Sequence, residues 1–389
     1  MAGSLTLVHG GKIVMPGSSG QVLEEHALLF DERVVDVIPE SKVGEAVAAY
    51  SNEPRRIDAR GAFVSPGFID IHTHGAAGSD VMDGTSEDLT KIGGFTLKNG
   101  VTSWLPTTLT APLQRIEGVL DVVRGHGKNT NEAEILGVHL EGPFIDAANR
   151  GAHDERFIVP PDGEWVTRHK DILRIVTFDP AKDESGAFTR ALSSSGIIPS
   201  LGHSAATCEC ALKAVKNGAK SFTHIFNAMS GLHHREPGMA GAAFASSTWA
   251  ELIADGIHVN KILFEPICRV KGPDRVLLVT DSMRATGLPD GSYDLGGLDV
   301  TVAEGAARLS SSGVLAGSVL EMNVALHNMK EATGRPIWEV VGMATTNPAA
   351  LLGVGNRKGS LKTGMDADVI FFDDHFNILR VFRSGTQIF

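Results

Sequence analysis

The sequence has few cysteines, no long apolar run and no recognisable export signal. Its three cysteines, Cys208, Cys210 and Cys268, cannot build a disulfide framework, so we expect reduced thiols in a cytoplasmic protein. No apolar stretch approaches the ~18 residues that a membrane span needs. Residues 1–15 lack the charged segment and apolar core of a secretory signal. These absences predict a soluble protein with no membrane partner.

Basic residues are too few for a nucleic-acid partner. Lysine and arginine number 35 against 46 aspartates and glutamates, which gives a formal net charge of −11. A general binder of nucleic acid or of anionic membranes has the opposite balance. The chain is long enough to bury a sizeable core, because it has 389 residues. They suit two to three domains, or one large α/β barrel with an appendage.

Short β-strands are predicted at both ends of the chain. Segments rich in β-branched and apolar residues lie at 5–8, 12–15, 27–30, 34–38, 367–372 and 378–382. Because neither end can bury a core alone, we expect the two to pack together as one small β-sandwich. The predicted division is residues 1–60 with 355–389 for this sandwich, and 61–354 for a separate catalytic domain.

Between the two ends, apolar strands alternate with helices. Eight apolar runs predict the strands, at 68–71, 101–106, 135–140, 172–178, 197–201, 221–224, 251–254 and 276–280. This alternation is typical of a parallel sheet, and eight strands indicate an α/β fold of the (β/α)₈ TIM-like barrel type. A doubly wound sheet shares the pattern but expects a glycine-rich phosphate turn after its first strand. Here that position reads His72-Thr73-His74.

Side chains that bind metals follow five of the predicted strands. They are His72, His74, Glu141, His203, His224 and Asp281. The carboxyl ends of barrel strands meet at one mouth, where active sites lie. Imidazole and carboxylate ligands without a cysteine suit Zn²⁺ or Fe²⁺. A bound metal lowers the pKa of its water and polarises a carbonyl. The remaining carboxylate, Asp281, would take a proton from that water and pass it to a leaving nitrogen.

Longer motifs around these residues resemble the amidohydrolase superfamily. The segment PGFIDIHTH at 66–74 is similar to the first-strand signature of that superfamily. HLEGPF at 139–144, LGHS at 201–204 and THIFNAM at 223–229 are similar to one branch, the N-acetylglucosamine-6-phosphate deacetylases. The resemblance extends through REPG at 235–238, ADGIH at 254–258, TDSM at 280–283 and LAGS at 315–318, and it covers nearly the whole chain.

The resemblance implies a metal centre. Glu141, His203 and His224 would hold the principal divalent metal, Zn²⁺ or Fe²⁺. Some members of the family have glutamine and asparagine at the positions of His72 and His74 and work with one metal. This chain keeps both histidines, so we expect one or two metals, the second bound by His72, His74 and the shared Glu141.

The resemblance also implies the catalytic and substrate-binding residues. Asp281 would be the acid/base, and His153 would help to polarise the substrate carbonyl. The sugar phosphate would contact Ala152, His153, Asn227, Ala228, Arg235, His258, Leu315, Ala316 and Gly317. In the family, the arginine that matches Arg235 reaches across a dimer interface, which implies a homodimer.

The expected reaction is hydrolysis of the N-acetyl group of N-acetylglucosamine 6-phosphate to glucosamine 6-phosphate and acetate, within amino-sugar metabolism. In one alternative the enzyme is still metal-dependent but acts on a different substrate, as a dihydroorotase, a cytosine deaminase or an N-acyl-amino-acid deacylase does. Another makes Ser204 a nucleophile, because residues 202–206 read GHSAA, close to the G-x-S-x-G turn. A third is a barrel that has lost its metal and serves as a binding module, although no ligand is missing.

Overall fold

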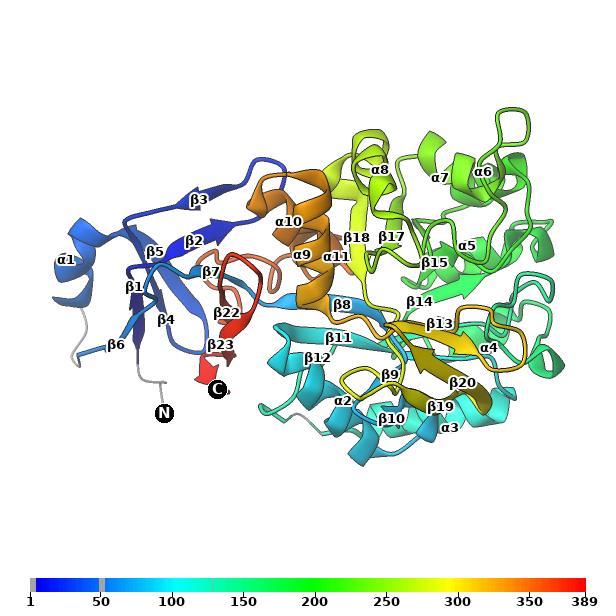
Figure 1. Ribbon diagram of the computed structural model, residues 1–389, viewed down its shortest axis with the longest axis horizontal. Helices are drawn as coiled ribbons and strands as arrows, with labels where there is room; N and C mark the ends of the chain where they lie inside the picture. Colours follow the sequence, from blue (N-terminus) through cyan, green and yellow to red (C-terminus); the bar gives the residue numbers. More distant parts are fainter. Residues whose placement is uncertain (1–4, 49–52, 128) are drawn as a thin grey trace.

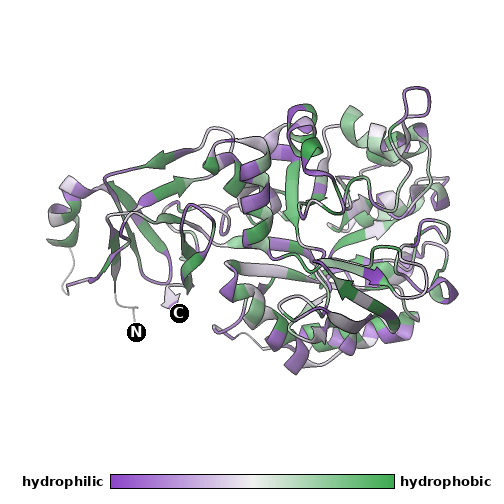
Figure 2. Cartoon of the chain, viewed as in Figure 1, coloured by the Kyte–Doolittle hydropathy of each residue, from purple (hydrophilic) through white to green (hydrophobic). Residues whose placement is uncertain are grey.

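The computed structural model describes residues 5–48, 53–127 and 129–389. Figure 1 shows the strands of the two chain ends, blue and red, side by side in one part of the molecule. A barrel occupies the other part. In Figure 2 the apolar residues of strands β2 (Lys12–Met15) and β18 (Val276–Val279) are green, and most of these apolar side chains are buried. None of the helices described here is both long and apolar enough to span a bilayer.

The barrel is built from eight parallel strands. They are β8 (Phe68–Thr73), β11 (Val101–Thr108), β13 (Val138–Glu141), β14 (Leu173–Phe178), β15 (Ile198–Leu201), β16 (Ser221–Phe222), β17 (Trp249–Ile253) and β18 (Val276–Val279). After β8, each strand in this list pairs with the next, and β8 pairs with β11. Between β18 and β8 the backbone N–H of Asp281 donates to the carbonyl of His72 at 2.8 Å. The predicted (β/α)₈ barrel is confirmed.

Helices cover the outside of this barrel. They are α2 (Ser86–Lys98), α3 (Leu113–Gly125), α4 (Gly163–Arg168), α5 (Ala187–Ser194), α6 (Cys208–Lys216), α7 (Gly238–Ala245), α8 (Phe264–Lys271), α9 (Met322–Thr333), α10 (Ile337–Met343) and α11 (Thr346–Leu351). The apolar faces of these helices pack on the strands, where Trp104 and Phe222 are fully buried. Burial of these apolar side chains drives the packing of the helices on the strands, and this packing fixes the positions of the strand ends.

Strands from both chain ends form two further sheets. The first has the order β5 (Val34–Pro39), β4 (His26–Phe30), β1 (Thr6–His9) and β6 (Arg55–Asp58). The second has the order β24 (Thr386–Gln387), β23 (Ile378–Arg383), β22 (Val369–Phe372), β7 (Phe63–Pro66), β2 and β3 (Gln21–Leu23). Phe30, Val369 and Phe382 belong to one buried apolar cluster. A small β-unit therefore contains strands from both ends.

The exact division into domains, 1–60 with 355–389 against 61–354, stays a prediction. Residues 1–4 and 49–52 of its first segment lie outside the described residues. Strand β7 begins after residue 60 and pairs with β22 and β2 in the second end sheet. The chain thus passes from that sheet into the barrel through Gly67, between β7 and β8.

A buried group of charges lies where the barrel meets the C-terminal strands. The Lys358 ammonium is 2% exposed and lies 2.7 Å from Glu134 and 3.0 Å from Asp366. It also contacts Asp368, just before β22. Although burial alone would raise the pKa of Glu134, hydrogen bonding from Arg357 and the charge of Lys358 lower it to about 2. Glu134 is therefore ionised at neutral pH and depends on these two cations.

A three-stranded antiparallel sheet that the sequence analysis did not predict follows the eighth barrel strand. It consists of β19 (Gly291–Leu295), β20 (Leu298–Ala303) and β21 (Ala306–Leu309). The Arg284 guanidinium fastens its first strand, because it lies 3.1 Å from Asp294 and 2.9 Å from Asp83. This sheet lies beside the mouth of the barrel and contributes apolar side chains to the cavity described below.

Candidate active site

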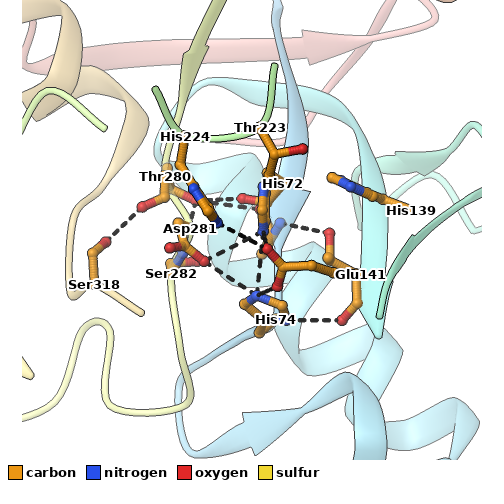
Figure 3. A network of polar contacts seen from close by, with 12 residues as sticks. His72, His74, His139, Glu141, Thr223, His224, Thr280, Asp281, Ser282 and Ser318 are labelled. Carbon is orange, nitrogen blue, oxygen red and sulfur yellow. Dashed lines mark hydrogen bonds and ion pairs between the residues drawn. The ribbon is translucent and has the colours of Figure 1, made fainter. Parts of the chain in front are cut away.

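The metal-binding residues predicted at the strand ends come together inside the barrel mouth. His72, His74, Glu141, His203 and His224 are each at most 5% exposed. Asp281 is 7% exposed. Figure 3 shows His72, His74, His224 and Asp281 turned toward Glu141, which comes from the end of β13. The structure thus brings side chains from five barrel strand ends to one point.

Three of these residues have a left-handed backbone, which few residues other than glycine adopt. The φ angles are 49° at His203, 28° at His224 and 49° at Asp281. Each residue directly or closely follows the end of its strand, and the turn directs its side chain into the mouth. Strand β16 accordingly ends at Phe222, two residues earlier than predicted. Such backbone strain costs of order 1–3 kcal/mol per residue and persists where the surroundings enforce it.

One group of donor atoms is formed by Glu141, His203 and His224. The Oε1 atom of Glu141 lies 3.1 Å from Nε2 of His203 and 3.0 Å from Nε2 of His224. Nδ1 of His203 donates to the carbonyl of Asn149 at 2.9 Å, because a carbonyl oxygen only accepts. In the neutral ring, Nε2 then carries a lone pair toward Glu141. Such convergence of imidazole and carboxylate donors fits a divalent metal.

A second group shares Glu141. Nε2 of His74 lies 3.2 Å from Glu141 Oε2 and 3.1 Å from Asp281 Oδ1, and Nε2 of His72 lies 3.4 Å from Glu141 Oε1. Burial lowers the pKa of His74, but Asp281 and Glu141 more than offset this and raise it to about 9. Two buried carboxylates therefore require positive charge here. Protonated imidazoles supply it in the metal-free protein, and a divalent cation would supply it instead.

His153 presents a proton donor to the same point. Its Nδ1 accepts from the backbone N–H of Thr110 at 3.1 Å, so the ring proton is on Nε2. That Nε2 atom lies 3.3 Å from Glu141 Oε2. Burial lowers the pKa of His153 to about 4, which keeps the ring neutral at neutral pH. A neutral imidazole with an inward N–H is suited to stabilising a developing oxyanion.

These groups lie in a cavity of ≈ 570 Å³ at the barrel mouth. Of the residues predicted to bind substrate, the following line it: Ala152, His153, Asn227, Ala228, His258, Leu315 and Gly317. Ala316 is fully buried and is not among the residues that line the cavity. Arg235 is exposed on the loop before α7 and does not line the cavity of its own chain; its Nη1 donates to Nε2 of His234 at 2.8 Å. The unpredicted sheet contributes Leu295, Leu298 and Leu309 to the cavity wall.

The model of the amidohydrolase family matches residues 63–388. The chain belongs to the amidohydrolase family. An N-acetylglucosamine-6-phosphate deacetylase of Lysinibacillus sphaericus is 40% identical over 339 residues, which are 85% of this chain and 86% of that protein. An N-acetylgalactosamine-6-phosphate deacetylase of Escherichia coli O157:H7 is 37% identical over 371 residues, 94% of this chain and 98% of that protein.

Solved structures resemble this amidohydrolase over nearly its full length. N-acetylglucosamine-6-phosphate deacetylase from Pasteurella multocida is 29% identical with a TM-score of 0.90, over 98% of this chain and 99% of that one. A variant of the Mycobacterium smegmatis enzyme, solved in complex with N-acetyl-D-glucosamine-6-phosphate, is 30% identical with a TM-score of 0.88, over 99% of this chain and 100% of that one. The likeness includes both the barrel and the end sheets.

Two buried residues of this amidohydrolase, which had no predicted role, contact the metal-binding group. Glu251 of β17 hydrogen-bonds Nδ1 of His72 at 3.0 Å, and the His139 ring lies 4.6 Å from the His72 ring. A carboxylate within the apolar strand WAELI was the available signal for Glu251, since an unpaired buried charge is costly. His139 gave a weaker signal, because a single histidine on a strand is commonly structural.

Proposed function

We propose that this amidohydrolase hydrolyses the N-acetyl group of N-acetylglucosamine 6-phosphate, releasing glucosamine 6-phosphate and acetate. The observation that carries the proposal is the convergence of Glu141, His203 and His224 with the inward N–H of His153 and the carboxylate of Asp281 in one cavity. The named activities of relatives that match most of the chain support the same substrate class. They disfavour the dihydroorotase-like and N-acyl-amino-acid deacylase-like alternatives.

In this proposal, Glu141, His203 and His224 hold a divalent metal. When bound, such a metal polarises the acetamide carbonyl and lowers the pKa of a neighbouring water. His153 donates its Nε2–H to the carbonyl oxygen as negative charge develops there. Asp281 takes a proton from the attacking water and returns it to the amide nitrogen as the C–N bond breaks. The products are acetate, which contains the former carbonyl carbon, and the sugar with a free amine.

The function is tested by measuring acetate and free amine from N-acetylglucosamine 6-phosphate with the metal-loaded protein. The same measurement on N-acetylgalactosamine 6-phosphate tests a second candidate substrate, which the relative from Escherichia coli O157:H7 favours. Equal amounts of acetate and amine support the proposal. Absence of release from both phosphosugars would exclude a hexosamine-phosphate deacetylase.

We further propose a cytoplasmic homodimer in which Arg235 binds the substrate phosphate in the cavity of the other copy. Arg235 is exposed and outside its own cavity, which supports a role at an interface between copies. His258, Asn227 and Ala228 would bind the sugar phosphate from within the chain. The negatively charged protein needs such a local cation to hold a phosphate dianion.

Replacing Arg235 with alanine should raise KM for N-acetylglucosamine 6-phosphate by about ten- to a hundredfold. Loss of a charge-assisted contact costs roughly 1.5–3 kcal/mol. Unphosphorylated N-acetylglucosamine lacks the contact, so its KM should change little. Arg269→Ala on α8 is the matched control, because Arg269 is also highly exposed. An equal rise in KM for both sugars would give Arg235 a structural role.

The proposed cofactor is Zn²⁺ or Fe²⁺, with two metals in the fully loaded chain. Elemental analysis should find two equivalents in the wild type and one in a His72→Gln, His74→Asn double variant. The variant removes two ligands of the second group and leaves Glu141, His203 and His224 intact. A wild type that never exceeds one equivalent under saturating metal would contradict the two-metal proposal.

A further inference from the structure

Glu251 is a buried carboxylate that the proposed reaction does not use. It is fully buried in the middle of β17, between Ala250 and Leu252, which are also fully buried. Burying a carboxylate costs several kcal/mol unless hydrogen bonds or opposite charges compensate. The partners of Glu251 therefore indicate what the residue does.

One oxygen of Glu251 contacts residues from both metal-binding groups. Its Oε2 accepts a hydrogen bond from Nδ1 of His72 at 3.0 Å and one from the backbone N–H of His224 at 3.3 Å. Its Oε1 is buried and has no hydrogen-bond partner among the described residues. The carboxylate is thus directed toward these two histidines.

His72 needs this contact to keep its ring oriented. Nε2 of His72 faces Glu141 and Asp281, both at 3.4 Å, only while Nδ1 points toward β17. Rotating the ring by half a turn would replace both nitrogens with carbon atoms. An accepting carboxylate on Nδ1 opposes that rotation and leaves Nε2 as the ligand atom.

His224 needs the contact for a different reason. Its backbone is left-handed, with φ of 28°, and this conformation requires enforcement by its surroundings. Its Nδ1 is buried without a hydrogen-bond partner in the described part of the chain, so no side-chain bond on that atom fixes the ring. The hydrogen bond from its own N–H to Glu251 therefore helps to hold the backbone from which the ring projects toward Glu141.

We infer that Glu251 is a positioning residue that holds His72 and His224 in their metal-binding orientations, one in each metal group. The inference rests on the proposed metal-dependent function. It extends the site by one residue on β17, a strand that contributes no proposed ligand. Loss of Glu251 should therefore weaken both metals together, and the second metal more, since there Glu251 holds the side chain itself.

A separate metal site at His72, His139 and Glu251 is the competing explanation, because their ligand atoms lie within 4.8 Å of one another. Both nitrogens of His139 are already used. Nδ1 donates to the carbonyl of Ile71 at 2.9 Å, and Nε2 lies 2.7 Å from the hydroxyl of Thr177. A metal there would break these bonds in a fully buried place, so positioning is the better explanation.

The test compares Glu251→Leu, Glu251→Gln and Glu251→Asp with the wild type after chelation and reloading with Zn²⁺. Leucine removes the acceptor, aspartate is too short to reach Nδ1, and glutamine keeps an acceptor oxygen. Partners of this kind typically change metal affinity by 10–100-fold. We expect that loss in the leucine and aspartate variants, with the second equivalent absent, and substantial rescue by glutamine. Ser103→Ala on β11 is the buried control, because its hydroxyl has no partner among the described residues.

Metal content and affinity are measured without substrate, so they are independent of whether the protein is a deacetylase. Thermal unfolding of the metal-free variants checks that each is folded. If the leucine variant does not fold, the aspartate variant decides. Wild-type Zn²⁺ affinity and stoichiometry in a folded leucine or aspartate variant would overturn the inference. If the wild type binds a single metal, a 10–100-fold loss at that metal supports the contact with His224, and an unchanged affinity overturns it.

Discussion

Replacement of Asp281 with asparagine should lower kcat by roughly 10²–10⁴-fold while the metal stays bound, the range that general acid–base catalysis supplies. Burial alone would raise the pKa of Asp281, but the charge of His72 and the hydrogen bond from His74 bring it well below the usual range. The carboxylate is therefore ionised and able to accept a proton. Asparagine keeps the shape of the side chain but cannot take that proton.

The decisive measurement is kcat for N-acetylglucosamine 6-phosphate alongside metal content. Asp274→Asn is a matched control, because Asp274 precedes the amino end of β18, the strand that Asp281 follows, and is exposed. Its kcat should equal that of the wild type. Near-normal turnover in a metal-loaded Asp281→Asn protein would remove Asp281 from the proton transfer.

Replacement of Lys358 with methionine should lower the free energy of unfolding by ~3–5 kcal/mol, as is typical when one partner of a buried ion pair is removed. Lys358 is 2% exposed and contacts Glu134, Asp366 and Asp368. Without it, the ion pairs left to these three carboxylates of low exposure, within the described residues, would be those with Arg357 and Arg33.

Urea unfolding at neutral pH measures this loss. The control is Lys91→Met on α2, since Lys91 is 50% exposed and its ion pair among the described residues is with Glu87, four residues earlier. Such surface pairs contribute about 0.3–0.5 kcal/mol. If the two substitutions destabilise the protein equally, the buried charges do not hold the barrel to the C-terminal strands as the structure implies.

The barrel and the identity of its polar strand ends were predictable because both depend on local sequence. Each barrel strand is an apolar run, and a polar residue directly after such a run marks the mouth. The length of β16 was not predictable in this way, because the left-handed turn at His224 depends on contacts with β17. Likewise, the alternation around Val300 and Val302 is typical of a strand, but only the assembled fold puts that sheet beside the cavity.

The contacts of Glu251 and the position of Arg235 were also not predictable from local sequence. The partners of Glu251 on β8 and after β16 are 179 and 27 residues away in sequence. Only closure of the barrel brings them together. The solvent-exposed position of Arg235 is a tertiary property of the loop before α7, and a sequence motif that carries an arginine does not specify which cavity it serves.

The pairing of β7 with β22 has a consequence for synthesis of the chain. Val369 pairs with Pro66, so about 300 residues must be made after β7 before its partner exists. During that time β7 presents an unpaired edge, which is the kind of surface on which nascent chains associate wrongly. The barrel strands all emerge earlier than β22. Strand β22 therefore completes a sheet whose strands β2 and β7 were made much earlier, and a chain that stops before residue 369 leaves that edge open.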